Sequence, residues 1–153
     1  MASANIAQQQ AVMARLAREL NEPVAVNDLG LVALRSGVRV LDLWGLASAE
    51  ALQARLKGPW TGARIDQLMA SQHVEIAMIY KNWFPDLPPS WTHVGGLVLA
   101  VPQASAAEPE VALMARTPEA ARRLQAAMVR LVTMHPQLGG LFWSDPLPQA
   151  DPP

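Results

Sequence analysis

The apolar positions of the chain fall into a few segments with helical spacing and several short continuous runs. Residues 4–21 place large apolar side chains near one face and Gln8–Gln10 on other faces, which predicts an amphipathic helix. The segment 74–80 is a nearly continuous apolar run, typical of a strand at the centre of a sheet. Further apolar runs predict strands over 24–26, 38–43, 91–100 and 111–115, the last of them at an edge of the sheet.

Capping residues indicate that helices separate these strands. Ser48 and Thr61 precede two predicted helices, and Thr117 precedes a third that has proline and glutamate in its first turn. Because helices lie between the first strands, those strands are expected to run parallel to one another. The predicted strand over 91–100 contains Gly95-Gly96, where we expect a bend or a bulge.

This order of elements predicts an α/β fold, a small layered sandwich with a mixed, partly parallel sheet of about four to five strands flanked by helices. A length of 153 residues suits one domain, which we place at 1–135. The remaining segment, 136–153, is rich in proline and predicts an irregular tail. Within it, the apolar residues 141–143 are candidates for docking on the domain.

Composition removes several classes of function. Hydrophobic residues make up 51% of the chain and charged residues 16%, the opposite of the balance found in disordered proteins. Lys and Arg number 12 against 13 Asp and Glu, so we expect no nucleic-acid partner. The absence of cysteine removes disulfides, thiolate nucleophiles and Cys-ligated metals. No apolar run is long enough to span a membrane, and the first residues lack the pattern of a signal peptide.

Polar side chains follow the first two predicted strands. Asn27 and Asp28 come directly after one strand, and Asp42 lies at the end of the next. Ligands bind at this edge of open parallel sheets, and two converging carboxylates suit acid–base chemistry or a divalent cation. The alternative is structural: Asp28 caps a helical turn and Asp42 accepts from backbone amides of the turn after it. In a reciprocal arrangement, Asn27 or Asp28 would bond the 42–46 turn and Asp42 the 28–31 turn.

Tryptophan is unusually frequent, with five residues against two Phe and one Tyr. Four of them flank predicted turns, where an indole either lines a sugar or lipid pocket or closes the end of a small core. The three histidines lack metal-ligand spacing, so we expect no metal site. The nucleotide-binding glycine motifs are also absent, and we expect no cofactor. The candidate ligand-binding residues are Asn27, Asp28, Asp42, Trp44, Tyr80 and Trp83.

A known family shares this pattern of short strands and turns. The chain reads VAVNDLG over 24–30 and VRVLDLWGL over 38–46, followed by HVEIAMIY over 73–80 and then Trp83-Phe84. This combination, within roughly residues 4–101, resembles the soluble C-terminal domain of bacterial polytopic membrane proteins of the C-type glycosyltransferase kind. That group contains protein mannosyltransferase-like and aminoarabinose-transferase-like enzymes. The resemblance implies a domain on the periplasmic side of the inner membrane, next to membrane helices that carry the transferase.

The resemblance implies no catalytic residue here, because the catalytic carboxylate of such transferases lies in an early loop between membrane helices. Asn27, Asp28, Gly30, Asp42, Trp44 and Gly45 match only as signature turns. We therefore expect a non-catalytic accessory domain that assists binding of a glycan or polyprenyl-phosphate substrate. Its partners would be membrane-embedded helices of the same or another protein. One alternative is a soluble, free-standing small-molecule- or protein-binding module, for which the sequence does not indicate a cellular compartment. Another is a small hydrolase that uses Asp28 and Asp42.

Overall fold

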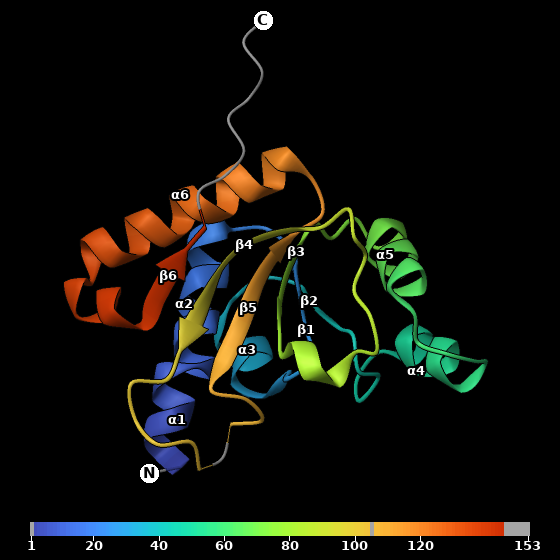
Figure 1. Cartoon of the computed structure of the whole chain (residues 1–153), viewed down its shortest axis with the longest axis horizontal. Helices are drawn as coiled ribbons and strands as arrows, with labels where there is room; N and C mark the ends of the chain where they lie inside the picture. Colours follow the sequence, from blue (N-terminus) through green and yellow to red (C-terminus); the bar gives the residue numbers. More distant parts are fainter. Residues whose placement is uncertain (1, 105, 146–153) are drawn as a thin grey trace, which may run out of the picture.

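The fold is a single mixed sheet with helices on both faces (Figure 1). The computed structural model describes residues 2–104 and 106–145. Its strands are β1 (Val24–Val26), β2 (Val40–Asp42), β3 (Ile76–Ile79), β4 (Thr92–Val98), β5 (Glu110–Ala115) and β6 (Phe142–Ser144). Its α-helices are α1 (Ala2–Gln8), α2 (Gln10–Leu20), α3 (Gly30–Arg35), α4 (Ala49–Leu56), α5 (Gly62–Ser71) and α6 (Pro118–Met134). Two 3₁₀ segments are η1 (Lys81–Trp83) and η2 (Pro136–Leu141).

The strand order within the described residues is β2-β1-β3-β5-β4-β6. β1 pairs in parallel with both β2 and β3, as the intervening helices predicted, and the other pairings are antiparallel. The expected α/β class with a partly parallel sheet is therefore confirmed. The prediction that 111–115 is an edge strand is wrong, because β5 pairs with β3 on one side and β4 on the other. Its five consecutive buried residues from Val111 are the pattern of an interior strand.

Alternate side chains along the strands divide between two apolar cores. On one face, Val26, Met78 and Leu113 pack in a cluster that includes Leu16 of α2 and Leu124 of α6. On the other face, side chains of β1, β3 and β5 lie in a cluster with residues of α5 and with two buried tryptophans. Figure 1 shows α2 and α6 on one side of the sheet and α4 and α5 on the other, which makes a three-layer sandwich.

The predicted N-terminal helix divides into two at Gln9. Gln9 is only 1% exposed, although the sequence pattern put Gln8–Gln10 outside the apolar face. Its amide oxygen accepts from the Tyr80 hydroxyl at 2.8 Å, and its amide nitrogen donates to the Glu108 carbonyl at 3.1 Å. The polar side chain is buried because both of its groups are satisfied by residues far away in the chain.

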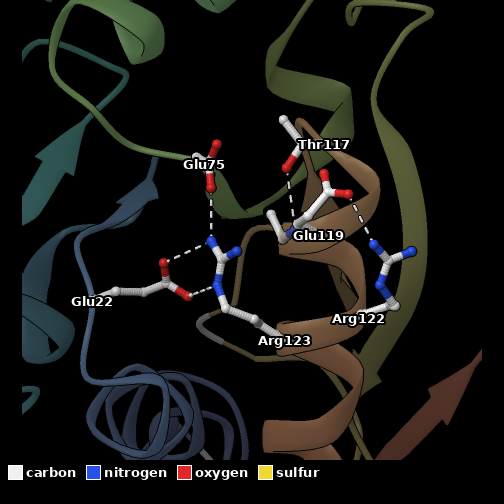
Figure 2. Close-up of polar contacts among 7 residues, drawn as sticks. Glu22, Glu75, Thr117, Glu119, Arg122 and Arg123 are labelled. Carbon is white, nitrogen blue, oxygen red and sulfur yellow. Dashed lines mark hydrogen bonds and ion pairs between the residues drawn. The ribbon is translucent and has the colours of Figure 1, made fainter.

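Two of the three predicted N-caps are confirmed. The Ser48 hydroxyl accepts from the Ala51 amide at 3.2 Å, and the Thr117 hydroxyl accepts from the Ala120 amide at 3.1 Å at the start of α6 (Figure 2). Thr61 makes no such bond. At that helix start the Gly62 amide donates instead to Asp86 Oδ2 at 2.9 Å, so a side chain from another loop replaces the local cap.

Residues 136–144 form η2 and β6 in place of the irregular tail that the sequence predicted. β6 pairs antiparallel with β4, so residues 141–143 dock on the domain and form a sixth strand, one more than the four or five expected.

The pairing of β4 with β5 shifts register between His93 and Gly95, close to the predicted bend. Residues 146–153 of the predicted tail lie outside the described residues. Within the described residues, no helix combines the length and apolar character that a membrane crossing requires.

Candidate functional site

The six candidate residues gather at the edge of the sheet where the parallel strands end. Asn27 and Asp28 follow β1, and Asp42 is the last residue of β2. Tyr80 follows β3 and is succeeded by η1, which contains Trp83. Because β1, β2 and β3 run parallel, their carboxyl ends meet at one edge, and the sequence positions converge as expected.

Asn27 joins the ends of β1 and β3. Its Oδ1 accepts from the Tyr80 amide at 3.0 Å, and its Nδ2 donates to the Tyr80 carbonyl at 3.4 Å. The side chain thus continues the strand pairing by one residue beyond the backbone ladder, and only 1% of it is exposed. Asn27 does not form the expected bond to the 42–46 turn, because both of its polar side-chain atoms bond to the backbone of Tyr80.

Asp42 closes the turn that follows its own strand. Its Oδ1 accepts from the Trp44 amide at 2.8 Å and its Oδ2 from the Ala47 amide at 2.6 Å. Gly45 lies inside this turn at φ 87°, where a side chain would be strained. The structural interpretation of Asp42 is therefore confirmed, while its expected bond to the 28–31 turn is wrong because the local amides occupy both oxygens.

Asp28 is held by the start of α2. Its Oδ2 accepts from Gln10 Nε2 at 2.5 Å, and α3 begins without a side-chain cap. The predicted capping role is therefore wrong, since the carboxylate faces α2 instead of the α3 amides. With Asp42 only 2% exposed and hydrogen-bonded through both oxygens, these two residues do not form the open carboxylate pair that the hydrolase hypothesis needs.

Aromatic side chains cover the same edge, and we call Trp44, Tyr80, Trp83 and Phe84 the aromatic ledge. The rings of Trp44 and Trp83 meet edge to face with centroids 4.8 Å apart, and Trp44 and Phe84 do so at 6.2 Å. The Arg55 guanidinium lies 3.7 Å from the centroid of the Trp44 ring and donates to the Trp44 carbonyl. A positive charge is thereby fixed against the ledge.

The four turn-flanking tryptophans divide into two structural classes. Trp60 and Trp91 are buried, and their indole nitrogens donate to the Leu43 carbonyl at 3.0 Å and to Asp66 Oδ1 at 2.7 Å. Trp44 and Trp83 are partly exposed, and their indole nitrogens have no hydrogen-bond partner among residues 2–104 and 106–145. The first pair closes the core, and the second pair leaves its indole donors unbonded within the described residues and part of its ring surface exposed.

Behind the ledge, a cavity of about 100 Å³ is lined by Asn5, Ile6, Gln9, Gln10, Tyr80 and Ala106. Burial, and then the negative charges of Asp28 and Glu108, raise the pKa of Tyr80 well above its usual range. Its hydroxyl therefore remains a proton donor to Gln9 at any physiological pH. Sequence reasoning missed Gln9, Gln10 and Arg55, and the run of three glutamines in an otherwise amphipathic helix was the one local signal for the first two.

The histidines do not join this site. His73 follows α5 at φ 53°, and His135 is the C-cap of α6, so both lie near helix C-termini. His93 lies on β4 with its Nδ1 3.4 Å from Asp145 Oδ2. Burial, and then the charge of Lys81, lower the pKa of His93 below its usual range. Across the described residues, no three His, Cys, Asp or Glu side chains are grouped closely enough to hold a metal ion.

The residues of this site lie within a segment that matches a known protein family. Residues 4–114 match the model of a family described as a domain of unknown function, DUF8728. The chain belongs to this family. The DUF8728 match contains β1 to β4 and all six candidate residues, and it ends within β5, before α6 and β6. No curated protein and no solved structure matches the chain.

Proposed function

We propose that this DUF8728 chain is a non-catalytic accessory domain of a membrane glycosyltransferase-like protein, and that its aromatic ledge helps to bind a glycan or polyprenyl-phosphate substrate. The observation that carries the binding role is the hydrogen-bonding state of the two partly exposed tryptophans. Trp44 and Trp83 have indole donors that no group in 2–104 or 106–145 accepts from, and they lie at the carboxyl edge of the parallel strands beside the fixed charge of Arg55. The resemblance over residues 24–30 and 38–46 supports the association with a membrane transferase on the periplasmic side.

The polar residues of the edge support a role without chemistry. Asn27 and Asp42 are buried and satisfied by backbone groups, and Asp28 accepts from Gln10. A general base or nucleophile must reach the substrate atom on which it acts. These groups instead hold β1, β2, β3 and α2 in register, which gives the ledge a rigid foundation.

The ledge has the chemistry of a sugar or sugar-phosphate contact. An indole packs on the apolar face of a sugar ring, and its N–H donates to a ring hydroxyl. Arg55 adds guanidinium donors that suit a phosphate oxygen. Rings from two separate segments are already packed together, so a ligand meets a preformed surface.

A patch of exposed leucines next to the ledge supports an apolar partner. Leu46 is 77% exposed, Leu52 43% and Leu56 78%. Leu52 and Leu56 are one turn apart on α4, and Gly45 packs against Leu52, which brings the turn containing Leu46 beside them. Under the proposed role, this patch meets the membrane-embedded helices.

Tryptophan fluorescence and calorimetry test the binding role. We expect saturable binding of methyl α-mannoside or farnesyl phosphate to the wild-type chain, and loss of that binding in Trp44→Leu. Trp143→Leu is the matched control, because Trp143 lies on β6, across the sheet from β2. Flat titrations with both probes, or equal binding by Trp44→Leu, would contradict the proposal.

An immunoblot of fractionated native cells tests the accessory role separately. A membrane-bound band several times larger than 16.5 kDa would support a domain of a transferase-like protein. A soluble band near 16.5 kDa would overturn the accessory role and leave a free-standing binding module.

A further inference from the structure

A groove between α2 and α3 collects three arginines. It has a volume of about 200 Å³ and is lined by Ala11, Ala14, Arg15, Arg18, Leu31 and Arg35. Its small alanines leave room between the helices, while the guanidinium groups come from both of them. α2 packs on the opposite side of the sheet from α4, which carries Arg55, so this groove is separate from the aromatic ledge (Figure 1).

The groove arginines have no acidic partner among residues 2–104 and 106–145, in contrast to the three arginines of α6. On α6, Arg123 pairs with Glu22 and Glu75, and Arg122 pairs with Glu119 (Figure 2). None of Arg15, Arg18 and Arg35 forms an ion pair with any residue of the described ranges, 2–104 and 106–145. Their positive charge is therefore left uncompensated at one place in a chain whose net charge is -1.

The acidic residues nearest in sequence are already engaged elsewhere. Glu19 pairs with Arg130 at 2.6 Å and Glu22 with Arg123 at 3.0 Å, and Asp28 accepts from Gln10. Arg18 donates to the Arg35 carbonyl, which links α2 to the end of α3 and fixes one guanidinium across the groove. The side chains of Arg15 and Arg35 make no hydrogen bond within the same ranges, so ten guanidinium N–H donors remain available to a ligand.

We propose that this groove binds the phosphate group of a phosphorylated ligand. A planar guanidinium presents paired donors that match two phosphate oxygens, and bidentate bonds of this kind are among the strongest in proteins. Three such groups around one hollow provide charge for a phosphate monoester or a diphosphate, whereas a carboxylate would use only one of them. This site is independent of the function proposed for the aromatic ledge, because no residue that lines the groove belongs to the ledge.

Calorimetric titration of the full chain with inorganic pyrophosphate tests this site. We expect wild-type binding that weakens as salt rises, and about a tenfold or greater loss of affinity in the double variant Arg15→Gln, Arg35→Gln. Arg18 is left unchanged because it links the two helices. Arg122→Gln removes a similar exposed arginine from α6 and is the matched control, with affinity expected to match the wild type.

Two results would overturn the proposal: no pyrophosphate binding by the wild-type chain at millimolar concentrations, or equal affinity in the double variant. Circular dichroism checks that the double variant is folded, and single variants Arg15→Gln and Arg35→Gln provide the same comparison if it is not. Flotation with phosphatidylglycerol vesicles, compared with phosphatidylcholine vesicles, identifies the source of the phosphate. If pyrophosphate binds, arginine-dependent binding to phosphatidylglycerol vesicles but not to phosphatidylcholine vesicles indicates a lipid headgroup. Pyrophosphate binding with no binding to either vesicle indicates a soluble phosphate.

Discussion

At the scale of single residues, the polar groups that looked most like a reactive site are structural. Asp42 and Asn27 each replace backbone partners that the ends of short strands lack, and both are buried. An aspartate at the end of a strand can accept from turn amides or bind a metal, and its place in the sequence does not separate the two roles. What separates the two roles here is which atoms lie within hydrogen-bond distance.

We expect Asp42→Ala to destabilise the chain by about 3 kcal/mol, because it leaves the Trp44 and Ala47 amides without their charged acceptor. Chemical denaturation measures the change. Glu119→Gln is the control, since its exposed pair with Arg122 contributes about 1 kcal/mol or less. An Asp42→Ala chain as stable as the control would show that the turn does not depend on this carboxylate.

The Asp66–Arg116 pair predicts a dependence of stability on pH. The hydrogen bond from Arg116, opposed in part by burial and aided by the Trp91 indole, lowers the pKa of Asp66 below its ordinary 3.8. The folded state therefore binds this proton less readily than the unfolded state. The stabilisation is complete above about pH 3.8 and is lost as the pH falls through the lower, folded-state pKa.

Asp66→Asn is accordingly expected to be less stable than wild type at pH 7, with the difference narrowing below about pH 3.8. Urea denaturation at several pH values measures it, and Glu119→Gln again serves as the exposed control. A difference between wild type and Asp66→Asn that stays constant from neutral to acid pH would show that the ion pair does not couple to folding.

At the scale of elements, the pairing of β6 with β4 depends on two adjacent glycines, Gly95 and Gly96. A Cβ on Gly95 would collide with the Trp143 carbonyl, and one on Gly96 would collide with the Trp143 indole. β4 therefore accepts β6 only because these two positions lack side chains. From the sequence, the same glycines predicted only a bend. Their pairing with β6 could not be predicted, because that strand lies almost fifty residues further along the chain.

Gly95→Ala is expected to displace β6 and lower stability by about 2 kcal/mol, since the clash is with backbone and cannot be relieved by a rotamer change. Hydrogen exchange of the β6 amides and thermal unfolding measure the effect. Gly140→Ala is the matched control, because no atom of the described residues other than its chain neighbours lies within 4 Å of the added Cβ. Unchanged protection of β6 in Gly95→Ala would contradict the packing argument.

At the scale of the whole molecule, the segment that matches the family lacks one of the helices that cover the sheet. It ends at residue 114, within β5, whereas α6 covers one face of the sheet. Leu124, Met128 and Leu131 of α6 are buried in that core. At about 2 kcal/mol each, they contribute about 6 kcal/mol, which is comparable with the whole stability of a typical domain.

A chain truncated after Arg116 is therefore expected to be largely unfolded, while one truncated after Asp145 retains the wild-type fold. Circular dichroism and thermal unfolding distinguish the two. The shorter chain would expose the sheet face that α6 covers, including Leu113 and Ala115. Cooperative unfolding of the shorter chain near the wild-type midpoint would show that α6 is dispensable for the fold.

The sequence by itself determined the local elements of this protein. The caps at Ser48 and Thr117, the central position of β3 and the parallel start of the sheet follow from interactions within a few residues or from the helices that separate the strands. It also determined that the polar and aromatic residues after β1, β2 and β3 share one edge, since the ends of parallel strands coincide.

Only the tertiary structure decided which of those side chains are engaged and which are free. Asn27 pairs with Tyr80, 53 residues away, and Tyr80 pairs with Gln9, 71 residues away. The interior place of β5, the division of the tryptophans and the uncompensated arginines between α2 and α3 depend in the same way on distant partners. Local patterns record which residues favour a helix, strand or cap, whereas hydrogen-bond saturation and charge pairing depend on which distant segments pack together.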